Sequence, residues 1–195
     1  MSFMNARFSR VKLLVLIVGV VAVGATLVIA AETQPKVGQE AKDFELASLG
    51  GGDAVKLSKL TETGPVVLVV LRGYPGYQCP LCTRQFGELL GKAEAFKKAG
   101  AQVVFVYPGP ANKLKEHASE FVKGKDYPDH FHFLLDPDYK FTNAYGLRWD
   151  AKNETAYPST FVIDAKRKVT FAMISTTHGD RSKVASVLKA LEGKQ

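Results

Sequence analysis

Residues 65–82 read PVVLVVLRGYPGYQCPLC, and this segment carries the strongest indication of the fold. Val66–Leu71 is an uninterrupted apolar run rich in β-branched residues, which is typical of a central strand buried on both faces. After the loop that follows, apolar residues recur at helical spacing, with Lys97 and Lys98 in the last turn and Gly100 as the stop. The residues at that spacing are Phe86, Leu89, Leu90, Ala93 and Phe96. The stretch therefore predicts a buried strand, a loop and a helix in succession.

The only two cysteines of the chain, Cys79 and Cys82, lie three positions apart at the start of this helix. The first turn of a helix presents unpaired N–H groups and the positive end of the helix dipole, which both stabilise a thiolate. Arg72 and Arg84 add positive potential nearby. A thiolate in this place attacks a disulfide or a peroxide, and the neighbouring sulfur then closes an internal disulfide. Spacing and position therefore predict a redox-active pair.

Three other uses of the cysteine pair stay open at this point. A structural disulfide suits an exported protein, although a separation of three constrains the unfolded chain little. A zinc site needs two further ligands, and the close histidine pair His130 and His132 lies about fifty residues away. Covalent haem attachment needs a histidine directly after the second cysteine, where Thr83 stands.

The rest of the chain supplies the other elements of an α/β fold. Phe44–Leu46 and Val55–Leu57 flank the turn-forming Gly50–Asp53 and predict a hairpin. Further strands are predicted at 103–107, 131–135, 160–164 and 169–174, and further helical segments at 112–122, 136–145 and 181–191. The order is βαβ followed by two antiparallel strands and a helix. We therefore predict a thioredoxin-like fold, a mixed central sheet flanked by helices.

The N-terminus has the pattern of an export signal. Three basic residues and no acidic one precede an uncharged apolar run at Leu13–Ala31. A basic flank before an apolar run directs export and keeps the positive end inside. The run is just long enough to span a bilayer as a hydrophobic helix, and the small residues at its end suit a signal peptidase. We expect residues 1–31 to be a signal peptide or membrane anchor, and residues 32–195 to be one domain on the extracytoplasmic, periplasmic side.

The distribution of basic residues argues against a nucleic-acid partner. The chain carries 26 basic and 19 acidic residues, a formal net charge of +7. Three basic residues precede residue 32, so residues 32–195 carry 23 against 19, a net charge of +4. The lysines of this part are scattered and form no stripe interleaved with aromatic residues, so we expect no nucleic-acid partner. No metal, nucleotide or flavin motif is visible, and we expect no cofactor.

Six segments between residues 37 and 175 match the pattern of a known family. They are Val37-Gly38, Asp43–Leu46, Tyr74–Cys82, Leu135–Asp138, Tyr145–Leu147 and Ser159–Asp164. With them the chain resembles the AhpC/TSA-type peroxiredoxin-like (redoxin) family of the thioredoxin superfamily. The family's active-site pattern is Pro, three residues, Thr or Ser, two residues, and then the peroxidatic Cys. Pro75 and Cys82 match the first and last positions, whereas Cys79 replaces the Thr.

This resemblance implies an antioxidant enzyme that reduces peroxides and depends on an external thiol electron donor. Cys82 would attack the peroxide oxygen, become a sulfenic acid and be resolved by Cys79. The Arg that usually precedes the Ser-Thr-Phe segment is absent, because Pro158 stands there. Arg148 is the candidate to replace it in space.

The cysteine pair also resembles that of the thioredoxin-like thiol-disulfide reductases. In that group the first cysteine is the nucleophile, opposite a cis-proline, and Tyr157–Phe161 matches the segment with Pro158 as the candidate cis residue. Gln78 replaces the tryptophan that commonly precedes the motif. By this resemblance Cys79 attacks a protein disulfide and Cys82 resolves the mixed disulfide. Peroxide reduction, which more of the chain supports, and disulfide reduction thus remain alternatives.

Overall fold

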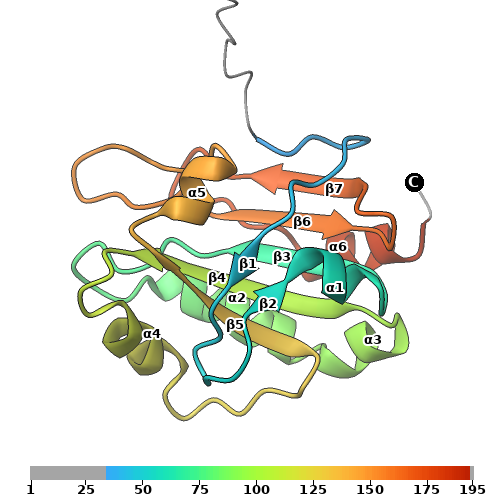
Figure 1. Cartoon of the computed structure of the whole chain (residues 1–195), viewed down its shortest axis with the longest axis horizontal. Coiled ribbons are helices and arrows are strands. Elements are labelled where there is room, and N and C mark those ends of the chain that lie inside the picture. The colour runs from blue at the N-terminus through green and yellow to red at the C-terminus, as the bar shows by residue number, and fades with distance from the viewer. Residues whose placement is uncertain (1–33, 194–195) are drawn as a thin grey trace, which may run out of the picture. The chain divides into compact units, whose positions relative to one another are not determined.

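A computed structural model of the chain describes residues 34–193. The N-terminal hydrophobic helix, predicted as a signal peptide or membrane anchor at residues 1–31, lies outside the described residues. Within residues 34–193 no helix combines the length and the apolar character needed to cross a bilayer. This part of the chain forms a five-stranded sheet, on which a two-stranded hairpin and the helices pack (Figure 1).

The central sheet has the strand order β5-β4-β3-β6-β7. Its strands are β3 (Val66–Val70), β4 (Gln102–Gly109), β5 (Phe131–Pro137), β6 (Ser159–Ile163) and β7 (Val169–Ile174). β3, β4 and β5 are parallel, and the connections between them run through helices, as parallel pairing requires. β6 pairs antiparallel with β3, and β7 pairs antiparallel with β6. The predicted mixed sheet of the thioredoxin-like fold is confirmed.

The face of the sheet that carries α2 (Pro80–Leu90) buries the larger of two apolar cores. Val67 and Val69 of β3 point into this core, where they meet Phe86 and Leu89 of α2. Three more helices border it: α3 (Ala93–Lys98), α4 (Leu114–Val122) and α6 (Val184–Leu191). Successive side chains of a strand point to opposite faces, and every residue of β3 is buried. The predicted burial of this strand on both faces is confirmed.

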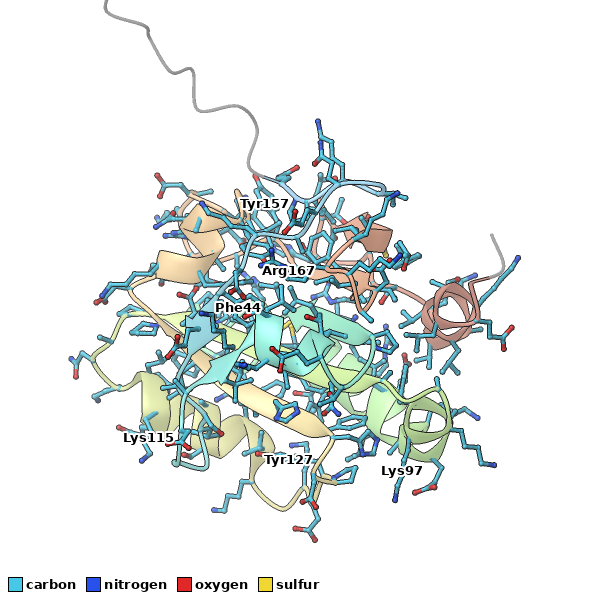
Figure 2. The ribbon with its side chains drawn as sticks, turned by 45° about the vertical axis from the view of Figure 1, so that its right-hand side comes forward. Phe44, Lys97, Lys115, Tyr127, Tyr157 and Arg167 are labelled. Atoms are coloured by element: carbon cyan, nitrogen blue, oxygen red, sulfur yellow. The ribbon has the colours of Figure 1, made fainter. Side chains whose placement is uncertain are left out.

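The opposite face carries a hairpin and two short helices (Figure 1). These are β1 (Glu45–Leu46), β2 (Val55–Lys56), α1 (Leu57–Thr61) and α5 (Lys140–Ala144). Phe44, which is labelled in Figure 2, packs edge-on against Phe141 and Tyr145, with ring centroids 5.1 and 6.1 Å apart. The antiparallel hairpin predicted around Gly50–Asp53 is therefore confirmed and closes the second core.

Two element boundaries differ from the sequence predictions. The helix expected across residues 86–98 is divided into α2 and α3 at Gly91 and Lys92. Gly91 closes α2 through its N–H, 2.8 Å from the Gly87 carbonyl, and Lys92 then leaves helical geometry (φ −117°, ψ 18°). Glycine weakens a helix, so Gly87 in the last turn and Gly91 at the C-cap favour an end there. β4 runs beyond its expected end to Gly109, which brings it alongside the cysteine loop.

Candidate active site

The loop from Leu71 to Cys79 joins β3 to α2 at the carboxyl edge of the parallel strands. Leu71 continues the pairing of β3 with β4 by donating its N–H to the Val106 carbonyl at 2.9 Å. The chain then turns at Gly73, which has φ +76° and passes close to Pro108 of β4. A Cβ at Gly73 would lie 2.1 Å from the Pro108 carbonyl oxygen, so only glycine fits. The loop is thereby fixed where ligands bind in open α/β sheets.

Cys79 is the N-cap of α2, and Cys82 lies in its first turn. Pro80 occupies the first helical position. An N–H at this position has no acceptor within the helix, so proline loses no hydrogen bond there. The Cys79 sulfur accepts a hydrogen bond from the Cys82 backbone N–H at 3.4 Å, and the Cys82 sulfur accepts one from the Arg72 backbone N–H at 3.4 Å. Both cysteines are free thiols with little exposure, 4% for Cys79 and 1% for Cys82.

One guanidinium group reaches both sulfurs. Arg181, in the loop between β7 and α6, places Nη2 3.8 Å from the Cys79 sulfur and 3.6 Å from the Cys82 sulfur. Its Nη1 donates to two carbonyls of the same loop, that of His178 at 3.1 Å and that of Asp180 at 2.6 Å. The site therefore holds a positive charge directly against the dithiol.

These contacts separate the pKa values of the two thiols. The hydrogen bond from the Cys82 thiol, aided by backbone N–H groups and the Arg181 charge, outweighs burial and lowers the pKa of Cys79 to about 5. The same hydrogen bond and burial raise the pKa of Cys82 well above its ordinary value of 9.0. At neutral pH Cys79 is a thiolate, and Cys82 keeps its proton.

The Arg72 side chain joins the cysteine loop to the segment before β6. Its guanidinium binds both carboxylate oxygens of Glu154, at 2.9 and 3.1 Å, and donates to the Asn153 carbonyl and the Tyr77 hydroxyl. The side chains of Arg72 and Glu154 are only 5% and 8% exposed, which makes them a buried ion pair. Burial alone would raise the pKa of Glu154, but hydrogen bonds from Arg72 and His178 lower it overall.

Gln78 fastens the residue before Cys79 to the rest of the domain. Its Nε2 donates to the His117 carbonyl at 2.8 Å and to the Glu120 carboxylate at 3.0 Å. Its Oε1 accepts a hydrogen bond from the Tyr107 hydroxyl at 2.9 Å. Gln78, which replaces the tryptophan of the disulfide reductases, therefore connects the loop to α4 and β4 by hydrogen bonds.

The predicted site residue Pro75 lies in the cysteine loop, and Pro158 lies beside the start of that loop. Pro75 is half-buried in the loop itself. Pro158 directly precedes β6, and because Ser159 pairs with Val70, it lies at the edge of the sheet where the loop begins. The expectation of a cis peptide at Pro158 is wrong, because no peptide bond in residues 34–193 is cis. The trans form is the more stable one before proline, and here it leads straight into the strand.

The structure does not bring Arg148 to the cysteines. Its guanidinium donates to the carbonyls of Trp149 and Thr155, and it lies 4.1 Å from the centre of the Tyr139 ring. Trp149 and Thr155 belong to the same turn of the chain as Arg148, and Tyr139 is the residue directly before α5. These contacts of the candidate replacement for the family's arginine involve neither cysteine.

Arg181, the cation that contacts the sulfurs, is not recognisable from the sequence. It was predicted only as the start of the last helix, and no local motif marks it. Ninety-nine positions separate Arg181 from Cys82, so their contact arises only when the loop before α6 packs beside α2. Arg84, which was expected to add positive potential, is instead exposed and pairs with Glu88.

The histidines considered as zinc partners have other contacts. His130 Nε2 lies 3.1 Å from the Ala93 carbonyl, and His132 Nε2 lies 2.9 Å from the Gln102 side-chain oxygen. Within residues 34–193 no three His, Cys, Asp or Glu side chains are grouped so that they could hold a metal ion. The Cys79–Cys82 pair has no third ligand in that part of the chain.

The chain is similar to proteins of one family over most of its length. The model of the AhpC/TSA family matches residues 37–172. Peroxidoxin BcpB from Mycobacterium tuberculosis is 24% identical, with a TM-score of 0.65 over 83% of this chain and 99% of that one. A yeast mitochondrial 1-Cys peroxiredoxin is 15% identical, with a TM-score of 0.65 over 80% and 75% of the two chains. A mutant of peroxiredoxin 6 from Arenicola marina is 15% identical, with a TM-score of 0.64 over 80% and 72%.

None of the curated proteins compared with the chain is significantly similar to it. The family match nevertheless spans more than half of the sequence, contains both cysteines and agrees with the resemblance seen between residues 37 and 175. The similar solved structures share the thioredoxin-like fold. The chain therefore belongs to the AhpC/TSA family and is a thiol oxidoreductase of the thioredoxin superfamily.

Proposed function

We propose that this enzyme reduces peroxides with Cys79 as the attacking thiolate and Cys82 as the resolving thiol. The observation that carries the proposal is the position of Cys79. Its sulfur caps the N-terminus of α2, lies 3.8 Å from the Arg181 guanidinium and has a pKa of about 5. Thiolates, not thiols, attack peroxide oxygen, so a sulfur that is ionised at neutral pH is the competent nucleophile.

The proposed cycle uses both cysteines and one external donor. The Cys79 thiolate attacks one peroxide oxygen, the O–O bond breaks, and the departing oxygen takes a proton to leave as an alcohol or water. The Cys82 thiol, which retains its proton at neutral pH, supplies that proton. Cys79 is then a sulfenic acid, and the Cys82 thiolate displaces its hydroxide to form the disulfide. An external dithiol returns two electrons and two protons.

This assignment exchanges the roles that the peroxiredoxin pattern gives to the two cysteines. The pattern makes Cys82 the peroxidatic residue, but Cys82 is 1% exposed, and its pKa is raised well above the ordinary value. A buried protonated thiol is a poor nucleophile. It is well suited to the second step, because its backbone N–H already contacts the sulfur that it must attack.

Reduction of protein disulfides is the second candidate function. The same thiolate at Cys79 favours it, because in that reaction also the first cysteine attacks and the second resolves. Exposed Tyr77, 53% accessible beside the cysteines, offers an apolar contact for a protein partner. The two functions differ in the substrate, an O–O bond or an S–S bond, and not in the attacking sulfur.

Single-turnover oxidation of the reduced full chain tests the proposal. We expect hydrogen peroxide or an alkyl hydroperoxide to oxidise the wild type and Cys82→Ser rapidly, and Cys79→Ser slowly. A sulfenic-acid reagent should label Cys79 in the Cys82→Ser variant. Oxidation that survives in Cys79→Ser but not in Cys82→Ser would reverse the two roles. Oxidation no faster than that of a free thiol, with Cys79 trapping mixed disulfides from an oxidised protein, would establish the disulfide reductase instead.

We also propose that the domain works outside the cytoplasm, carried there by residues 1–31. The support is the uncharged run at Leu13–Ala31 behind a basic flank. A reporter that is active only after export, fused behind residue 195, should be active. Deletion of residues 2–31 should abolish its activity, and an active reporter without these residues would refute the proposal. Extraction of membranes with alkaline carbonate then separates an anchor, which stays with the membrane, from a cleaved signal.

A further inference from the structure

The loop that carries Arg181 is tied to the rest of the domain at few points. At its first end the Ser175 N–H donates to the Pro158 carbonyl at 2.9 Å, and at its last end the Ser182 hydroxyl donates to Thr160 at 2.9 Å. Between these ends, within the described chain, residues 176–180 make one hydrogen bond outside the loop. It joins His178 Nε2 to Glu154 Oε1 at 2.7 Å.

His178 is held in a defined seat although its side chain is 57% exposed. Its ring stacks on Trp149 with centroids 5.0 Å apart, and Trp149 stacks on Tyr157 at 4.8 Å. Its carboxylate partner is itself immobilised, because Glu154 is 8% exposed and bound through both oxygens by Arg72. An exposed ring is therefore anchored on a rigid, buried acceptor.

The same residue also holds Arg181 through its backbone. The His178 carbonyl accepts a hydrogen bond from Arg181 Nη1 at 3.1 Å, while Nη2 of that guanidinium contacts both sulfurs. On the other side, the Arg72 backbone N–H contacts the Cys82 sulfur. The contacts thus form a closed ring from Cys82 through Arg72, Glu154, His178 and Arg181 back to the dithiol.

We propose that His178, seated on Glu154, is a positioning residue that keeps the Arg181 guanidinium on the Cys79 sulfur. A long arginine side chain on an irregular loop loses much conformational freedom when it is held in one place, so it needs fixed partners. The electrostatic effect of a cation on a thiolate weakens as the distance grows. The inference rests on the proposed function only in taking Cys79 as the attacking thiolate.

The thiolate absorbance of Cys79 near 240 nm, followed against pH, tests this role in the full chain. A Cys82→Ser background leaves Cys79 as the only thiol. In that background Arg181→Met should raise the pKa of Cys79 by about one unit, because a nearby opposite charge is lost. His178→Phe keeps an aromatic ring on Trp149 but has no donor for Glu154, and it should raise the pKa in the same direction. His178→Gln retains a donor and should restore the pKa towards that of the background.

A matched histidine provides the control. His130→Ala removes a histidine that contacts the Ala93 carbonyl, away from the dithiol, and it should leave the pKa of Cys79 unchanged. A pKa that rises in Arg181→Met but not in His178→Phe would overturn the inference. An unchanged pKa in Arg181→Met would overturn it as well. In both cases peroxide oxidation of Cys79, measured separately, would still decide the proposed function.

Discussion

Two adjacent residues, Arg72 and Gly73, hold the cysteine loop for different physical reasons. The Arg72 backbone touches the Cys82 sulfur, while its side chain is buried and neutralised by Glu154. Gly73 holds the loop by its lack of a side chain, since it combines a positive φ with a close approach to Pro108. The geometry of the cysteine loop therefore depends on the Arg72–Glu154 ion pair and on the absence of a side chain at Gly73.

Gly73→Ala should destabilise the protein by several kcal/mol, because a new Cβ would meet backbone and the residue would also be strained at φ +76°. Gly51→Ala is the matched control, with φ +85° but no atom within 4 Å of its Cβ. It should cost only about 1 kcal/mol, the price of the backbone conformation. Urea denaturation of both variants measures the difference. Equal losses would mean that the approach to Pro108 is not limiting.

Glu154→Gln should lower the free energy of unfolding at pH 7 by about 3 kcal/mol, because Arg72 would be left as an unpaired buried charge. The pKa of Glu154 is lowered in the folded state, so its contribution is present above the ordinary value of 4.5. It is lost as the pH falls through the folded-state pKa. Denaturation at pH 7 and at pH 3 should show the gap between wild type and variant closing. A gap that stays constant would contradict the ion pair as its source.

The first turn of α2 is the element on which the proposed chemistry depends. It combines an N-cap sulfur, a proline at the first position and backbone N–H groups directed at that sulfur. The Cys79 side chain is a helix cap, and in the proposed mechanism it is also the nucleophile. Sulfur is a weak acceptor, but as a thiolate it also interacts favourably with the positive end of the helix dipole.

Substitutions at Cys79 can separate the two roles. Cys79→Ser retains a side-chain acceptor for the Cys82 N–H, whereas Cys79→Ala does not. We expect the serine variant to be more stable than the alanine variant by about 1 kcal/mol. Both should be inactive towards peroxide. Urea denaturation under reducing conditions measures the stabilities, and equal values would show that Cys79 is not a cap.

Across the whole molecule, the sheet assembles the site from three distant segments. β3 and its loop bring Arg72 and the cysteines, the turn before β6 brings Glu154, and the loop before α6 brings Arg181. They meet because β6 runs antiparallel beside β3, so that its beginning lies next to the end of β3. Because the contacts between these segments and the sulfurs exist only in the folded chain, the ionisation of the dithiol is linked to the free energy of unfolding.

The reduced chain should become more stable as the pH rises from about 5 towards 9. Cys79 has a pKa of about 5 when folded, against an ordinary value of 9.0, so within this window the unfolded chain binds more protons. The free energy of unfolding should rise by about 1.4 kcal/mol per pH unit relative to Cys79→Ser. Denaturation at pH 6, 7 and 8 under reducing conditions measures the slope. Parallel curves for the two proteins would mean that Cys79 is not a thiolate when folded.

The core strand, the order of the elements and the place of the two cysteines at a helix start could all be predicted from the residues alone. These features are local: Val66–Leu71 can be buried on both faces because all of it is apolar, and Cys79 and Cys82 lie at a helix start because of the residues around them. The break at Gly91 was missed although it is also local, because the apolar period continues through it.

Which charged groups contact the sulfurs depends on how distant parts of the chain pack together. The sequence does not show which group each arginine contacts. In the folded chain Arg148 lies over the Tyr139 ring and Arg181 contacts the dithiol. The Arg72 guanidinium binds Glu154. The tertiary structure also separates the pKa values of two neighbouring thiols, which depend on burial and on which N–H groups and charges point at each sulfur. Such contacts join residues about a hundred positions apart, and a chain acquires them only when its sheet is complete.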